Sequence, residues 1–299
     1  MVTHHTNRQY TEGFTLFELS IVIVIIGFIA GGILVGRDLI YASGVRATIA
    51  QIERYNQAVR TFEQKYNDQL PGDMNATTAT QFGFAARGAY AGEGDGNGII
   101  EGVSADAASS NGGQFEGGGE TLAFWVDLSA VKLIDDSFTI ATPNAPITSI
   151  SGTFINNYFP AAKLGNRNYI YVWSGGWAMN DGINYYGISN ITRVTHGLTT
   201  GFSKPGLTVK QAYDIDNKID DGMPQTGAVI AMYLNGGRLW IGDYDGTTGG
   251  PVVSGDGIAT AGSATTCYDN SNTAGATEIY SLAQNNGTGI NCVLSFKFQ

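Results

Sequence analysis

The sequence predicts an α+β protein in which one long N-terminal helix carries a globular head built on an antiparallel β-sheet. Three observations predict this fold. Residues 14–35 form an almost unbroken apolar run, and the apolar residues that follow recur at helical spacing as far as Pro71. Beyond residue 150, runs of β-branched and aromatic residues alternate with glycine and asparagine turns, which is typical of strands.

The composition limits the classes of function. The chain has 299 residues, enough for one large domain or two small ones, and 42 of them are glycine. Only 14% of the residues are charged and the formal net charge is -10, so no basic surface is available to neutralise nucleic-acid phosphates. Cys267 and Cys292 are a pair that an oxidising compartment would bridge, and two unpaired buried thiols are the alternative. We expect no nucleic-acid partner.

The apolar run from Phe14 to Val35 is long enough to cross a membrane. As a helix rising about 1.5 Å per residue it would span about 33 Å, the thickness of a bilayer core. A cleaved secretory signal has a shorter apolar region followed by small residues, so this segment is expected to stay as an anchor. Glu18 is the one ionisable residue in it, and a charge at mid-bilayer costs about 2.5 to 3.5 kcal/mol and usually marks function.

The residues from Gly13 to Ala30, G-F-T-L-F-E-L-S-I-V-I-V-I-I-G-F-I-A, closely resemble the class III leader and first helix of type IV prepilins and type II secretion pseudopilins. In that family a prepilin peptidase cuts after the glycine and the new N-terminal residue is N-methylated, which implies cleavage after Gly13 and methylation of Phe14. The resemblance implies a ladle-shaped, single-pass inner-membrane precursor with its head in the periplasm. An inner-membrane assembly platform would add it to a periplasmic or extracellular filament of its own copies or related pilins.

Glu18 is similar in place and surroundings to the assembly glutamate of that family. When a subunit leaves the bilayer and joins a bundle of identical helices, a buried ammonium and a buried carboxylate each need a partner. Glu18 of one subunit would supply the carboxylate for the Phe14 amine of a neighbour, which selects the axial stagger. The alternative is a tolerated glutamate near the membrane surface.

Residues 37–70 continue the helix with one apolar face. The apolar residues near helical spacing are Leu39, Val45, Ile49, Ile52, Ala58 or Val59, Phe62 and Tyr66. Proline disfavours helix at its own position and just before it, so the helix is expected to end by Leu70-Pro71. The predicted organisation is a leader over 1–13, a membrane and assembly helix over 14–36, an amphipathic continuation over 37–70 and a head over 71–299.

The head is expected to combine short helices with strands. Residues 83–119, rich in glycine and alanine, predict a long loop. Helices are predicted over Glu120–Asp135 and Thr208–Asp221. The predicted strands are Tyr169–Trp173, Tyr185–Val194, Ala228–Leu234 and Arg238–Ile241, the last two joined by a hairpin turn at Asn235-Gly236-Gly237. We therefore predict an antiparallel sheet packed on the long helix.

An acidic glycine-rich loop, E-G-D-G-N-G-I-I-E, runs from Glu93 to Glu101. It places oxygen-bearing side chains at alternate positions, as in the first half of an EF-hand loop, although Ser104 stands where the closing glutamate would be. Calcium is the cofactor that this pattern indicates, and a plain Gly-Asp-Asn turn is the alternative. The predicted ligands are Glu93, Asp95, Asn97, the Ile99 carbonyl and Glu101. Related pseudopilins often use calcium, which favours a site without locating it.

A second acidic cluster ends the helix predicted over residues 208–221. Its members are Asp214, Asp216, Asp220 and Asp221. Carboxylates at a helix C-terminus oppose the macrodipole, so a metal or a basic side chain of a neighbouring subunit would compensate them. The alternative is a solvated acidic helix end.

Cys267 and Cys292 enclose 24 residues, which resembles the disulfide-bounded loop near the C-terminus of many type IV pilins. A bridge closing this loop would contribute roughly 3 to 4 kcal/mol in the loop-entropy account. The loop would offer a surface for neighbouring subunits or for adhesion.

No catalytic constellation is visible. His196 is the only histidine after Gly13, and neither G-x-S-x-G, H-E-x-x-H nor a phosphate loop occurs. We therefore predict a structural pilus subunit and not an enzyme. The alternatives are a type II secretion pseudopilin and a membrane-anchored adhesion module, whose sugar platform would be the four tryptophans if they are not core. A third alternative function is a membrane-tethered enzyme that relies on His196 and the acidic clusters.

Overall fold

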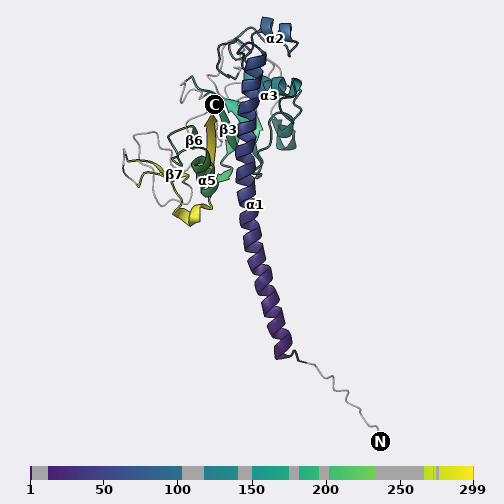
Figure 1. The fold of residues 1–299 in the computed structure, drawn as a ribbon, viewed down its shortest axis with the longest axis vertical. Coiled ribbons are helices and arrows are strands. Elements are labelled where there is room, and N and C mark those ends of the chain that lie inside the picture. Colours follow the sequence, from purple (N-terminus) through teal and green to yellow (C-terminus); the bar gives the residue numbers. More distant parts are fainter. Residues whose placement is uncertain are drawn as a thin grey trace. The chain divides into compact units, whose positions relative to one another are not determined.

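A computed structural model describes residues 13–102, 118–140, 150–174, 182–194, 202–232, 266–271 and 276–298, together with Met1 and Thr273. The chain divides into two compact units, Met1–Ser43 and Gly44–Gln299. Helix α1 (Leu16–Lys65) begins in the first unit and ends in the second (Figure 1). The predicted α+β class is confirmed, because the long helix is accompanied by an antiparallel sheet.

The first unit holds the apolar part of α1. An 18-residue window of this helix has a mean hydropathy of 2.7 and none of it is buried. Among the described residues, α1 is the one helix long and apolar enough to cross a membrane. Phe17 and Phe28 are 74% and 78% exposed, so these side chains need a lipid or protein surface to cover them. The helix therefore has the length and apolarity of the membrane anchor that the sequence predicts.

In the second unit, α1 buries one face. Val45, Ile52, Val59 and Phe62 are at most 5% exposed and recur at intervals that keep them on one side of a helix. Leu39 was predicted on this apolar face, but it is 66% exposed and lies in the first unit. The buried stripe therefore begins at Val45.

The helix ends at Lys65, a turn earlier than the predicted limit. Asn67 and Asp68 have φ of 57° and 58°, which a right-handed helix cannot accommodate. The Tyr66 N–H bonds the carbonyls of both Phe62 and Glu63, which tightens the last turn. The two left-handed residues thus end the helix before Pro71 does.

The main sheet is antiparallel throughout and is organised around two strands, β3 (Tyr185–Val194) and β9 (Ile290–Lys297). β3 pairs with β9 along Tyr185↔Lys297 to Ile188↔Leu294. The strands that pair with β3 are β1 (Ile150–Ser151), β2 (Asn168–Trp173) and β4 (Phe202–Lys204). Those that pair with β9 are β5 (Leu207–Thr208) and β6 (Val229–Met232). A separate pair is β7 (Tyr268–Asp269) with β8 (Ile279–Tyr280).

Local capping explains the short helices. In α2 (Ala76–Phe82), which the sequence analysis missed, the Asn75 side chain caps the N-terminus and Gly83, at φ 78°, ends the helix. α3 (Glu120–Ala130) stops five residues before the predicted end, because Lys132 has a φ of 57°. α5 (Val209–Ile219) starts at a capping box made by Thr208 and Gln211. The 3-10 turns are η1 (Gly152–Asn157) and η2 (Gln284–Gly287).

The strand predictions agree with the structure where it is described. β3 has the predicted bounds, β2 begins one residue earlier than predicted, and β6 begins one residue later, while residues 233 and 234 lie outside the described residues. The turn Asn235-Gly236-Gly237 and the strand Arg238–Ile241 lie outside the described residues, as does nearly all of the leader. The described part of 83–119 contains no helix or strand before α3 begins at Glu120.

The core joins α1, α3 and the sheet through aromatic side chains. Trp125 meets the ring of Tyr55 edge-on, with the ring centroids 5.1 Å apart. Trp173 stacks on Tyr185, and Trp125 and Trp173 are fully buried. These two tryptophans are core residues and not a sugar platform; Trp177 and Trp240 lie outside the described residues.

Candidate functional site

The predicted cleavage bond lies outside regular structure. Gly13 to Thr15 form neither helix nor strand, and Phe14 is 87% exposed. Among the described residues other than its chain neighbours, no atom lies within 4 Å of the position that a Cβ on Gly13 would occupy. A peptidase needs an accessible backbone, and Gly13 and Phe14 are exposed immediately before α1.

Glu18 lies in the first turn of α1 and takes part in a capping box with Thr15. The Glu18 carboxylate accepts hydrogen bonds from the Thr15 N–H and from its hydroxyl, both at 2.9 Å, and the Thr15 hydroxyl accepts one from the Glu18 N–H at 3.2 Å. A negative charge is also favoured at a helix N-terminus by the macrodipole. The T-x-x-E pattern at Thr15–Glu18 is a sequence signature of this cap, and the sequence analysis missed it.

A group of three carboxylates lies where the acidic loop meets α3. Asp73, Asp95 and Glu120 each offer an oxygen within 4.8 Å of the others. The N–H groups of Gly96 and Gly98 donate to Asp73, and those of Gly94 and Glu101 donate to Glu120. The loop therefore surrounds two buried carboxylates with its own amides.

Burial governs the acid–base chemistry of this group. It raises the pKa of Asp73 to about 7, against the effect of the donors Gly98 and Gly96. Burial also raises the pKa of Glu120 well above its usual value, and the neighbouring Asp73 charge adds to the rise. Near neutral pH the group can hold a shared proton or a cation, since carboxylates this close are difficult to ionise together.

The five predicted calcium ligands are distributed differently from the expectation. Only Asp95 belongs to the three-carboxylate group, whose other members, Asp73 and Glu120, were not predicted. Glu93 is buried and its carboxylate accepts the N–H groups of Ala89 and Tyr90. The side chains of Asp95 and Asn97 accept N–H groups two residues later, from Asn97 and Ile99 respectively. Calcium at this loop stays a prediction.

Three of the four aspartates predicted at the end of α5 come together. Asp216, Asp220 and Asp221 place carboxylate oxygens within 4.8 Å of one another, whereas Asp214 pairs with Lys210 at 2.8 Å. Each carboxylate of the trio also accepts hydrogen bonds from nearby chain. Asp216 accepts from the Tyr280 hydroxyl and Asp220 accepts from the N–H groups that start β6. Burial raises the pKa of Asp216 to about 7.

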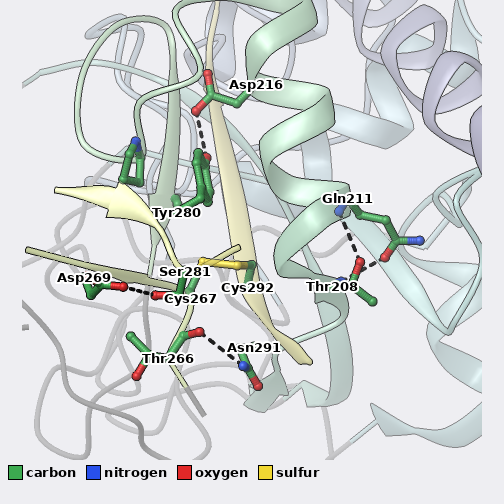
Figure 2. Close-up of a disulfide and its surroundings, with 12 residues drawn as sticks. Thr208, Gln211, Asp216, Thr266, Cys267, Asp269, Tyr280, Ser281, Asn291 and Cys292 are labelled. Atoms are coloured by element: carbon green, nitrogen blue, oxygen red, sulfur yellow. Dashed lines mark hydrogen bonds between the residues drawn. A yellow bond between two sulfur atoms is a disulfide. The ribbon is translucent and has the colours of Figure 1, made fainter. Parts of the chain in front are cut away.

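Cys267 and Cys292 form a disulfide, as predicted (Figure 2). The bridge joins the chain just before β7 to the interior of β9, and both half-cystines are buried. Around it, Ser281 donates to Asp269 and Asn291 donates to the Thr266 carbonyl. The bonded loop is thus attached to the main sheet and, through Tyr280 and Asp216, to α5.

Residues 8–34 match the family model of the prokaryotic N-terminal methylation motif. This motif is the class III signal peptide of type IV pilins and pseudopilins, so the resemblance is confirmed and the protein is type IV pilin-like or pseudopilin-like at its N-terminus. It implies processing by prepilin peptidase and assembly with related pilins. No curated protein and no solved structure matches the chain. His196 lies outside the described residues.

Proposed function

We propose that this chain is a structural subunit of a type IV pilus or pilus-like filament, cleaved after Gly13 and N-methylated at Phe14. The observation that carries the proposal is the methylation motif over residues 8–34, which ends in the apolar helix. An exposed, accessible Gly13 and an exposed α1 are what processing and polymerisation need. This function requires no catalytic site.

The physical basis of assembly is the apolar half of α1. Its side chains would be covered by lipid in the precursor and by the same helix of neighbouring copies in the filament. Transfer between these environments leaves the Phe14 ammonium and the Glu18 carboxylate away from water, where each stabilises the other. The precursor would therefore lie in the inner membrane with its head in the periplasm, and the assembly platform would move it into a periplasmic or extracellular filament.

The test is electron microscopy of sheared surface filaments, with N-terminal sequencing of their subunit. A methylated Phe14 start is expected; a subunit that begins at Met1, or one absent from filaments, would contradict the proposal. Glu18→Gln keeps an acceptor for Thr15 and removes the charge, so it should abolish filaments while cleavage continues. Asp68→Asn, which neutralises an exposed carboxylate after the helix, is the matched control and should assemble normally.

A secretion pseudopilin would use the same motif and helix. Deletion of the gene separates the two roles, because a pseudopilin is needed for protein secretion and a pilin for surface filaments. Loss of filaments with an unchanged set of secreted proteins supports the pilus. The reverse result would assign the chain to a type II secretion system.

A further inference from the structure

The exposed face of α1 in the second unit carries an excess of positive charge. Arg46, Glu53 and Arg60 are seven residues apart and form one exposed stripe, since seven residues are about two helical turns. Arg54 and Lys65 are exposed as well, roughly 100° and 140° around the helix from Glu53 and Arg60, and the half-buried Glu63 interacts with Arg60. The exposed surface of α1 in the second unit therefore carries four cations against the exposed Glu53 and the half-buried Glu63.

A groove beside the stripe extends the basic surface. Its volume is about 370 Å³, and it lies between α1 and the turn that follows α3. Arg54 lines one side, and the exposed Lys132 and Lys163 line the other. Asp135 and Asp136 are its acidic members, and Asp135 lies 3.9 Å from Arg54 with both side chains largely exposed, an arrangement that contributes little stability. We call Arg46, Arg54, Arg60, Lys65, Lys132 and Lys163 the basic face.

The rest of the chain has the opposite charge. Residues 66–299 contain ten lysines and arginines, two of them in the basic face, against 21 aspartates and glutamates, of which Asp73, Glu93, Glu120, Asp127, Asp216 and Asp269 are buried. The basic face is thus a positive surface on a head whose formal net charge is negative. Opposite potentials on two surfaces of one chain favour contact between copies, because like surfaces repel and unlike ones attract.

We propose that the basic face binds the acidic head surface of a second copy of this chain within the filament. A filament grows by a heterologous contact, in which each copy uses two different surfaces, and this charge separation supplies such a pair. The inference rests on the proposed function and names the contact made by the heads, separate from the Phe14 and Glu18 contact of the membrane helices.

Charge reversal tests the contact in the full-length protein. The test variant combines Arg54→Glu, on the α1 side of the groove, with Lys132→Glu, on the opposite side. Arg54 is a helix cation, and Lys132 is a loop cation with a φ of 57°. The matched control combines Lys218→Glu with Arg167→Glu, both outside the basic face. Lys218 is an exposed helix cation, and Arg167 is an exposed loop cation with a φ of 58°. The first pair should lower the yield of sheared filaments about tenfold or more and the control less than about twofold, with cleaved subunit present in both.

A second measurement does not depend on folding of the reversed variant. A carbodiimide couples a lysine amine to a carboxylate in contact with it, so wild-type filaments should give a ladder of covalent dimers and larger species. The triple variant Lys65→Arg, Lys132→Arg and Lys163→Arg keeps the charge and removes the reactive amines. It should assemble normally and lose most of the ladder.

The outcomes separate the two proposals. If wild-type filaments form but the reversed pair assembles as well as its control, or the arginine variant keeps its ladder, the basic face does not bind a second copy and the filament function stands. Absence of wild-type filaments removes the proposed function itself. Normal filaments together with weaker binding of the reversed pair to vesicles of anionic lipid would assign the face to a membrane surface and overturn the inference.

Discussion

Thr15 and Glu18 bond each other in both directions across the first turn of α1. Both residues lie after the predicted cut at Gly13, so processing leaves the capping box intact. The glutamate that assembly is proposed to use is therefore held in one place before a neighbour arrives. A carboxylate that is already oriented loses less side-chain freedom when it meets the ammonium of the next subunit.

Replacing Thr15 tests this cap. Thr15→Ala removes the hydroxyl that bonds Glu18 in both directions and should destabilise the first turn by about 1 kcal/mol, whereas Thr15→Ser should keep most of it. Amide hydrogen exchange in detergent micelles should become faster from Leu16 to Leu19 in the alanine variant alone. Equal exchange in both variants would show that the cap does not stabilise the helix start.

The buried pair of Arg87 and Asp127 should be important for the stability of the head. The two side chains are 2% and 0% exposed and lie 2.5 Å apart, and the Asp127 carboxylate also accepts the Gly72 N–H. Asp127→Ala leaves a buried guanidinium without its partner and should cost about 3 to 5 kcal/mol in urea unfolding. Asp214→Ala breaks the more exposed pair with Lys210 and should cost at most about 1 kcal/mol. Similar losses in the two variants would contradict this assignment.

The stability of the head should fall as the pH rises from about 4 to about 7. Burial raises the pKa of Asp73 to about 7, above the value of about 4 expected in the unfolded chain. The folded state then binds more protons than the unfolded state across this window, so the free energy of unfolding decreases with pH. Asp216 contributes in the same direction, with a pKa of about 7.

Asp73→Asn should flatten this dependence, because it removes one of the groups that take up a proton on folding. Urea unfolding measured at several pH values between 4 and 7 gives the slope for each variant. The exposed Asp68→Asn should leave the slope unchanged. An unchanged slope in Asp73→Asn would mean that this carboxyl is ionised at the same pH in both states.

Calcium binding by the acidic loop has a direct test in calorimetric titration. If the sequence prediction is right, calcium should release heat and raise the melting temperature, and Asp95→Ala should remove both effects. Asp214→Ala, which neutralises a carboxylate paired with Lys210, is the control and should bind like the wild type. No heat and no thermal shift in the wild type would reject calcium.

Loss of the disulfide should destabilise the head by about 3 to 4 kcal/mol in the loop-entropy account. Cys267→Ala with Cys292→Ala removes it without leaving a free thiol. Faster amide exchange is expected first in β7 and β8, because these two-residue strands pair only with each other in the described structure. If exchange instead rose equally in β2 and β3, the bridge would be stabilising the whole head.

Local signals explain which parts of the fold the sequence predicted. The apolar run and helical period located α1, and the turn residues around Tyr185–Val194 located β3. The predicted end of α3 was wrong because Lys132 adopts a left-handed backbone conformation that no local sequence propensity requires. The strand β9 was missed because residues up to Cys292 were interpreted as the disulfide-bounded loop and no element was predicted for residues 293–297.

The carboxylate group required information that spacing does not contain. Asp73 and Glu120 are 47 positions apart, and only the folded loop brings them to Asp95. Residues 93–101 were predicted to be a self-contained ligand set, whereas the amides of this loop donate to Asp73 and Glu120, which lie outside it. The local sequence pattern therefore predicted the position of the carboxylate group but not which side chains form it.

The position of β9 has a consequence for biosynthesis. This strand pairs with β3, β5 and β6, and the ribosome makes it after all three. The sheet therefore cannot close before residues 290–297 have been made, and its aromatic strands must wait for them. Because such distant pairing is slow, a nascent head is exposed to chaperones and proteases until β9 is available to pair.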